Sequence, residues 1–139
     1  MTSEFAVAVH ALVYLNHKGQ TLSSEALAEN VCTNPARIRK VMSKLKRAGL
    51  VSTKEGMDGG YHFSGDASAV TLRMVCDAVD AKLVSACWKP GNEEMECLVA
   101  SGMGNILDGI YAELDELCRE RLARTTIRDI DEHIFGEKS

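Results

Sequence analysis

Seven basic residues and no acidic residue lie within residues 33–54, and this run constrains the chain more than any other feature. Its beginning resembles a helix start, because Asn34 is a favoured N-cap and Pro35 fits the first helical position. Gly49 suits the position just after a helix end. The pattern predicts a helix over residues 35–48 with an exposed side that is entirely positive, and such a surface favours contact with a polyanion.

The predicted helix has an apolar face and a basic face. Its apolar residues recur at helical spacing and must pack on other helices: Ile38, Val41, Met42 and Leu45. A helix in the major groove of DNA needs this division, because the core holds one face while the other reaches base edges and phosphates. A helix that only needs solubility usually mixes Glu with Lys at four-residue spacing. We therefore favour a DNA contact over a solvated surface.

Short elements surround this helix. Apolar spacing predicts two helices before it, one over residues 3–17 and one that begins at Ser23 or Ser24 and contains Val31. Two β-prone segments follow it, at residues 50–54 and 61–63, joined by a glycine-rich turn. Two short helices joined by a tight turn and followed by a hairpin form a winged helix-turn-helix pattern. We expect a mainly α fold with a small hairpin wing that binds double-stranded DNA.

The residues expected nearest to DNA lie in the first turns of the third helix, because the N-terminal part of a recognition helix enters the groove. Glycines of the wing permit close approach of backbone to a duplex. The full set of DNA-binding candidates is Ser24, Thr33, Asn34, Pro35, Ala36, Arg37, Arg39, Lys40, Ser43, Lys44, Lys46, Arg47, Lys54, Gly59, Gly60 and Tyr61.

Charge separates the chain into two parts. The 139 residues have a net charge of −4, yet residues 1–64 carry eight basic and five acidic side chains, and residues 65–139 carry eight basic and fifteen acidic ones. The length fits one domain with an oligomerisation segment. No apolar run approaches the roughly 20 residues of a membrane span. The first residues lack a signal-peptide pattern, so we expect a cytoplasmic protein.

The acidic part contains a long predicted helix over residues 98–124. Its apolar residues step by 4, 3, 4 and 3, which is the spacing of a coiled coil. These residues, here called the seam, are Met103, Leu107, Ile110, Leu114 and Leu117. The seam predicts a homodimer. We expect a DNA-binding domain over residues 1–81, a sensor or linker loop over 82–97, and a dimerisation helix with a short C-terminal helix over 98–139.

The motifs of residues 23–64 resemble those of the bacterial winged-helix regulators that include IscR, NsrR and CymR. They are Ser-Ser-x-x-Leu-Ala, Pro-x-x-Ile-Arg-Lys, Leu-x-x-Ala-Gly-Leu-Val-x-Thr and Gly-x-x-Gly-Gly-Tyr. Residues 5–15 and 125–130 are also similar to that family, so the resemblance extends over almost the whole chain. It implies a dimeric repressor or activator, with the third helix and the wing on DNA and the long helix crossing its partner.

The five cysteines are an odd, scattered set, which makes a poor disulfide framework. Some members of the resembled family hold an iron–sulfur cluster on three cysteines before the dimerisation helix. Cys97 resembles the third ligand and Cys87 the first, but residues 89–94 offer no second cysteine. We therefore favour a chain without a cluster, expect no metal site and leave the cofactor open. The sensor candidates, for an oxidant or a small molecule, are Cys87, Cys97, Cys32 and Trp88.

Two other functions remain as alternatives. A thiol enzyme needs a reactive cysteine beside a base, and the chain contains neither Cys-x-x-Cys nor a nucleophile elbow, so we expect no enzyme. A winged helix that only binds proteins would bind DNA weakly and without sequence preference. Selection of ligands from a random DNA pool separates this alternative from a sequence-specific regulator.

Overall fold

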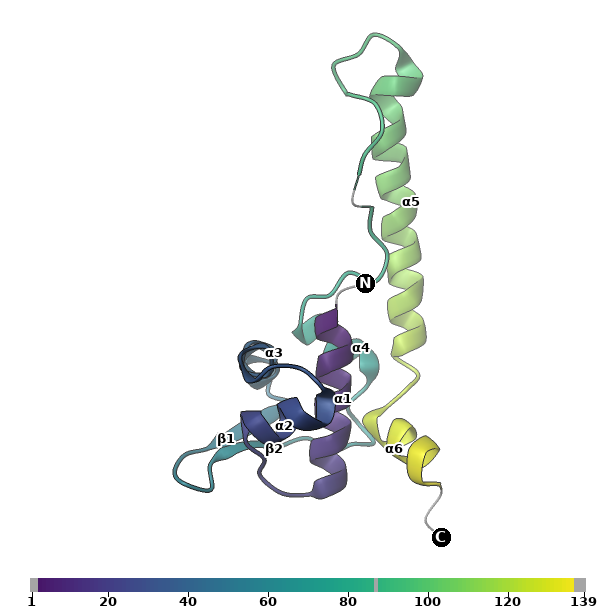
Figure 1. Cartoon of the computed structure of the whole chain (residues 1–139). Helices are drawn as coiled ribbons and strands as arrows, with labels where there is room; N and C mark the ends of the chain where they lie inside the picture. Colours follow the sequence, from purple (N-terminus) through teal and green to yellow (C-terminus); the bar gives the residue numbers. More distant parts are fainter. Residues whose placement is uncertain (1–2, 87, 137–139) are drawn as a thin grey trace.

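A computed structural model describes residues 3–86 and 88–136. Helices α1 to α3 and a hairpin, β1 and β2, come first, and helices α4 to α6 follow. The elements are α1 Ser3–Lys18, α2 Ser24–Val31, α3 Pro35–Arg47, β1 Val51–Lys54, β2 Gly60–Phe63, α4 Leu72–Ala78, α5 Leu98–Leu122 and α6 Ile127–Phe135. The mainly helical fold with a hairpin and a long C-terminal helix is confirmed. Figure 1 shows that α5 projects from a body formed by the other elements.

Side-chain caps set the starts of the early helices. The Ser23 hydroxyl accepts a hydrogen bond from the Ala26 N–H at 3.1 Å and begins α2. The Asn34 side-chain oxygen accepts from the Arg37 N–H at 2.8 Å and begins α3, with Pro35 in its first turn. Gly49 follows α3 with a φ of +80°, a conformation that favours glycine. These short-range signals explain why the sequence predicts this part of the fold well.

The core of the body is built mainly by α1 and α3, and α2 and α4 add to it. Leu12, Ile38, Met42 and Val75 are fully buried in it. Ile127 at the start of α6 is also fully buried in this core. The chain therefore returns to the body after α5, and α6 packs against α1.

Backbone hydrogen bonds fix the start of α6 next to the start of α4. The Leu72 N–H donates to the Thr125 carbonyl at 2.8 Å, and the Ile127 N–H donates to the Val70 carbonyl at 3.0 Å. The segment that follows α5 in sequence is thus tied to the body. In residues 3–86 and 88–136, none of the helices is long and apolar enough to cross a membrane.

The lower end of α5 is held by a polar joint formed by Asp115 and Arg119. The Asp115 carboxylate accepts from the backbone N–H groups of Leu83 and Val84 at 2.7 and 2.9 Å. The Arg119 guanidinium binds Asp115 at 2.9 Å and also binds Asp77 and the Ala81 carbonyl. The joint therefore connects α5 to α4 and to the segment that follows α4.

Candidate nucleic-acid interface

Helix α3 presents the basic face expected of a helix that contacts DNA. Its apolar stripe, residues 38, 41, 42 and 45, is fully buried against the body. The side chains of Arg39, Lys40, Ser43, Lys46 and Arg47 are exposed on the other side, while Arg37 and Lys44 are half-buried. In Figure 1 α3 and the hairpin lie on the side of the body away from α5 and α6. The fold therefore leaves the basic surface open.

The turn before α3 positions its first residues. Cys32 has a φ of +65° and ends α2, and the Thr33 N–H donates to the Ala28 carbonyl at 3.0 Å. Because the Asn34 side-chain oxygen caps α3, its amide nitrogen is the part of that side chain left for other partners. Pro35 is half-buried and Ala36 is exposed beside it. The start of α3 is thus fixed by its own caps.

The wing is a two-stranded antiparallel hairpin in which Val51 pairs with Phe63 and Lys54 pairs with Gly60. Tyr61 and Leu22 exchange backbone hydrogen bonds of 2.8 and 2.9 Å, which attach the wing to the segment between α1 and α2. A Cβ on Gly60 would lie 2.2 Å from the Leu22 carbonyl oxygen. This close approach is a structural reason for glycine at position 60.

Gly59 and Lys54 lie at the turn of the wing. A Cβ on Gly59 would lie 2.5 Å from the Lys54 carbonyl oxygen, so this glycine permits the tight turn. The Lys54 side chain is exposed, as is the neighbouring Met57. The tip of the wing therefore offers one positive side chain to solvent close to the end of β1.

Two acidic residues from other helices reach the basic face, and the sequence reasoning missed both. The Glu4 carboxylate on α1 lies 2.8 Å from the Lys44 ammonium and 3.3 Å from the Lys40 ammonium. The hydrogen bond from Lys44 is the largest cause of a lowered pKa at Glu4, and the bond from Lys40 adds to it against the desolvation of the carboxylate. On α2, Ser24 and Glu25 lie 3.3 and 3.8 Å from the Arg39 guanidinium.

No local signal finds these pairs. Glu4 precedes Lys44 by 40 residues, and only the packing of α1 against α3 brings them together. Ser24 is one of the DNA-binding candidates, and the structure places its hydroxyl beside Arg39. The basic run is thus free of acidic residues in sequence but is partly neutralised in space.

The seam on α5 is largely uncovered in the single chain. Met103, Ile110, Leu114 and Leu117 are 37, 46, 43 and 59% exposed, and Leu107 is half-buried. Three further apolar side chains at the upper part of the helix are exposed as well: Leu98, Val99 and Ile106. A row of large apolar side chains on one helix is more than scattered surface hydrophobicity and is typical of an interaction surface.

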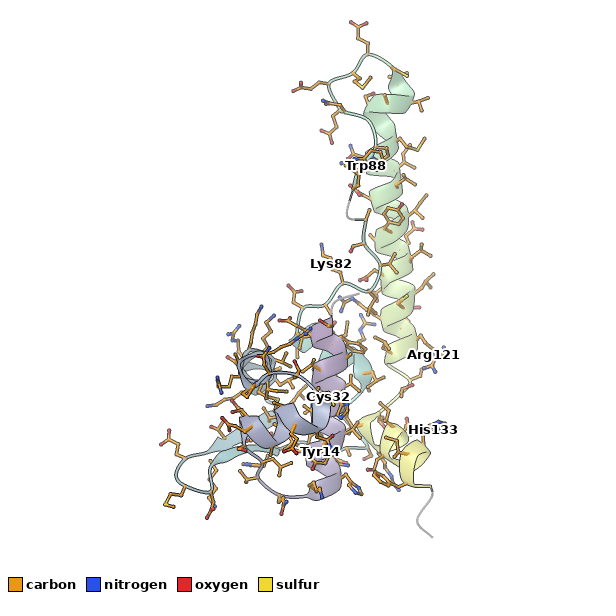
Figure 2. All side chains as sticks on the ribbon, viewed as in Figure 1. Tyr14, Cys32, Lys82, Trp88, Arg121 and His133 are labelled. Carbon is orange, nitrogen blue, oxygen red and sulfur yellow. The ribbon has the colours of Figure 1, made fainter. Side chains whose placement is uncertain are left out.

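The sensor candidates are separated in the structure. Cys97 precedes α5 at the end farthest from the body, whereas Cys32 lies in the body (Figures 1 and 2). The backbone N–H groups of Ala100 and Val99 lower the pKa of the exposed Cys97 thiol. Trp88 is 75% exposed on the loop that runs along α5. Cys87 lies outside the described residues.

The loop before α5 is held by Lys89, which the sequence reasoning also missed. Its side chain packs on Gly104, where a Cβ would come within 2.3 Å of it. Its ammonium donates to Asn105 at 2.7 Å and lies 3.3 Å from Asp108. Hydrogen bonding to Asp108 is the largest cause of a raised pKa at Lys89. A lysine therefore holds the segment in which the cluster pattern needs a second cysteine.

Among the described residues, Cys97 has no gathered set of further metal ligands around it. Within residues 3–86 and 88–136, no three His, Cys, Asp or Glu side chains gather closely enough to hold a metal ion. Cys76 is buried in the core, where desolvation raises the pKa of its thiol, and it donates to the Ala81 carbonyl. Cys76 therefore does not supply the second ligand beside Cys97.

Comparisons with known proteins agree with this geometry. Residues 1–133 match the Rrf2 family, described as an iron-dependent transcriptional regulator. YwnA of Bacillus subtilis, named as an HTH-type transcriptional regulator, is 29% identical over 135 residues, covering 97% of this chain and 99% of YwnA. IscR of Vibrio vulnificus is 26% identical over 128 residues, covering 91% of this chain and 69% of IscR.

The fold is also found in solved structures. A transcriptional regulator from Lactobacillus plantarum superposes with a TM-score of 0.81 at 24% identity, covering 97% of this chain and 91% of that one. The family match over nearly the whole chain, the caps of α3 and the wing register all lead to one assignment. The chain belongs to the Rrf2 family of winged-helix transcriptional regulators.

Proposed function

We propose that the protein is a homodimeric regulator that binds a specific, pseudo-palindromic DNA site through α3 and the wing. The observation that carries this proposal is the exposed, basic side of α3, held in place by a fully buried apolar stripe and flanked by an attached wing. Such an arrangement offers cations to phosphates and a helix start to base edges. Family membership adds support, because Rrf2 regulators bind DNA as dimers.

Dimerisation through the seam follows from its exposure. A second α5 packed on the same face would remove Ile110, Leu114 and Leu117 from water. A two-fold dimer presents two α3 helices, so the half-sites should lie about one turn of DNA apart, roughly 34–36 Å, or a multiple of that. The division at residues 81 and 97 into binding, loop and dimerisation parts stays part of this proposal.

Roles within the interface follow from position on α3. Arg37 and Arg39, near the helix start, are proposed to contact base edges, with Thr33, Asn34 and Ala36 next to them. Lys46 and Arg47 lie in the last turn and are proposed to contact phosphates. Lys54 extends the phosphate contact from the wing. Pro35, Ser43, Gly59, Gly60 and Tyr61 shape or flank the same surface. The last three candidates, Ser24, Lys40 and Lys44, take part in the pairs described above.

The loop of residues 82–97 is proposed as the place where a signal acts. Cys97 is exposed with a lowered pKa, which favours the reactive thiolate. Cys87 and Trp88 belong to the same loop, while Cys32 adjoins α3 directly. These features favour an oxidant as the signal, sensed by its reaction with a thiol. The response is the binding or release of DNA, not catalysis. A regulator of this kind acts in the bacterial cytoplasm.

Selection from a random pool of duplex DNA tests the proposal. We expect one palindromic motif to be enriched, and fluorescence anisotropy should then show salt-dependent binding of two chains to one selected duplex. Binding that is weak and equal for all duplexes would instead support a winged helix that binds proteins. The pairing of Arg39 and Lys44 with acidic side chains is the feature that favours this second candidate.

A further inference from the structure

The carboxylate of Glu4 binds two lysines of the proposed DNA-binding helix. Its two oxygens lie 2.8 Å from the Lys44 ammonium and 3.3 Å from the Lys40 ammonium. Only 19% of the Glu4 side chain and 29% of the Lys44 side chain are exposed, whereas Lys40 is 69% exposed. Lys44 is therefore held against α1 instead of extending into solvent, and Lys40 is only loosely held.

An ammonium that is already paired contributes less to DNA binding than a free one. Affinity for any duplex comes largely from the release of counterions when Lys and Arg neutralise phosphates. The partner of Lys44 is a carboxylate of the same chain, which is not released and which repels a phosphate that approaches Lys44. By contrast, Lys46 and Arg47 are exposed, and no carboxylate lies within 4.0 Å of either in the part of the chain that the structure describes.

We propose that Glu4 is a specificity-determining residue that neutralises Lys44 and weakens Lys40, and so limits sequence-independent binding of α3 to DNA. This inference rests on the proposed function. Specificity is a difference between two affinities, and lowering the affinity for the wrong sites increases it. The competing sites in a genome are numerous, so an acidic side chain within a basic surface increases the fraction of protein that is bound at the specific site.

The first test compares Glu4→Gln with the unchanged protein on a fluorescein-labelled duplex of random sequence. Each added phosphate contact steepens the plot of log affinity against log salt by about 0.9, so Glu4→Gln should bind roughly five- to tenfold more tightly at about 0.1 M salt. The gain should be smaller on the selected duplex, because base contacts there already fix α3. Equal or weaker binding of Glu4→Gln to the random duplex would overturn the proposal.

A matched control separates local pairing from net charge. Glu120→Gln removes one negative charge from an exposed residue of α5 and should leave both affinities within about twofold of the unchanged protein. The double variant Glu4→Gln/Lys44→Gln removes both members of the closer pair and should return random-duplex binding to the original level or slightly above it, because Lys40 also loses its acidic partner. Two results would show that Glu4 does not neutralise Lys44. One is a double variant that binds the random duplex as weakly as Lys44→Gln alone. The other is a Glu120→Gln/Lys44→Gln variant whose binding is restored as fully as that of Glu4→Gln/Lys44→Gln.

Two further measurements keep the outcomes distinct. Glu4→Asp retains the negative charge, so its salt slope should stay close to that of the unchanged protein. If Glu4 had a purely structural role, Glu4→Asp would behave like Glu4→Gln. Thermal unfolding of each variant checks the fold. If the unchanged protein itself shows no salt-dependent binding to any duplex, the proposed function fails; if it binds but Glu4→Gln changes nothing, only the role of Glu4 fails.

Discussion

The Arg119 guanidinium donates to the Asp115 carboxylate at 2.9 Å, one helical turn along α5, and the same two side chains hold the segment that follows α4. Asp115 is 18% exposed and Arg119 14% exposed. The pair is thus largely removed from water at the place where α5 leaves the body. Its loss should separate α5 from the body more than the loss of any exposed ion pair on α5.

Asp115→Ala should lower the free energy of unfolding by about 1–3 kcal/mol, because it leaves Arg119 and two backbone N–H groups without their acceptor. Urea unfolding followed by circular dichroism measures this change. Glu113→Ala, an exposed residue of the same helix, serves as the control and should change stability by less than about 0.5 kcal/mol. Equal effects of the two substitutions would contradict the role of the joint.

The same carboxylate predicts how stability depends on pH. The Val84 N–H is the largest cause of a lowered pKa at Asp115, and Arg119 and the Leu83 N–H also lower it, against a desolvation that raises it. A carboxyl with a lowered folded-state pKa stabilises the fold above its unfolded pKa of about 3.9, and this stabilisation is lost as the pH falls through the folded pKa. Asp115→Asn should therefore lose less stability on acidification below about pH 4 than the unchanged protein.

Arginines near the start of α3 and lysines near its end should differ in their effect on DNA binding. Arg37→Ala or Arg39→Ala should cost about 1–3 kcal/mol on the selected duplex and relax its sequence preference. Lys46→Ala should weaken binding to all duplexes alike and reduce the salt slope by about one. Anisotropy titrations on selected and random duplexes measure both. If all three variants lose the same affinity for selected and random duplexes, the arginines do not contact base edges.

A charge on the seam should separate the dimer. Leu114→Asp places a carboxylate among Ile110 and Leu117, which two chains cannot bury without a large desolvation cost. Sedimentation velocity should show monomers for Leu114→Asp and dimers for the control Glu120→Ala. A Leu114→Asp protein that remains dimeric would show that the seam is not the interface.

Gly60→Ala should destabilise the wing more than Gly56→Ala does. Both glycines have positive φ, +150° and +108°, so each substitution carries backbone strain of about 1–3 kcal/mol. Only at Gly60 would the added Cβ also meet the Leu22 carbonyl oxygen, whereas at Gly56 nothing lies within 4 Å. Thermal unfolding and hydrogen exchange of Tyr61 compare the two variants. Equal destabilisation by the two substitutions would mean that backbone strain alone, and not the contact with the Leu22 carbonyl oxygen, sets the loss of stability.

The thiols of Cys97 and Cys76 should react at very different rates. In a Cys87→Ser background, Cys97 should react quickly with an aromatic disulfide at neutral pH, because its pKa is lowered and it is exposed. Cys76, buried and with a raised pKa, should react only when the protein unfolds. Adding Cys97→Ser should remove the fast phase. Its persistence would assign that phase to another thiol.

The sequence predicts the body of the fold because its signals are short-range. Asn34, Pro35 and Gly49 define α3 within one residue, and the boundary at Arg47 instead of Ala48 lies within ordinary variation in assigning helix ends. The glycines and β-prone residues after α3 predict the hairpin in the same way. Each of these features depends on neighbours within about four residues.

Contacts between distant residues escape this reasoning. The pairs of Glu4 with Lys44 and of Arg39 with Glu25 arise from helix packing. The packing of the Lys89 side chain on Gly104 depends on how the loop before α5 folds back along that helix. The burial of Ile127 in the same core as Leu12 depends on the return of the chain after α5. A periodicity identifies the apolar side of a helix but does not identify the surface that it meets.

The attachment of α5 to the body at its base alone makes this helix a lever. Its 25 residues span about 37 Å, and its base is pinned by Asp115 on one side and by the start of α6 on the other. A shift of about 10 Å at the tip, where Cys97 lies, then corresponds to a rotation of only about 15° at the base. Small rotations of the body, such as those that would change the distance between the two α3 helices of the proposed dimer, are therefore amplified at the tip. Conversely, a chemical reaction at the tip rotates the body only if it moves the tip of α5 far or displaces the second copy of α5 in the proposed dimer.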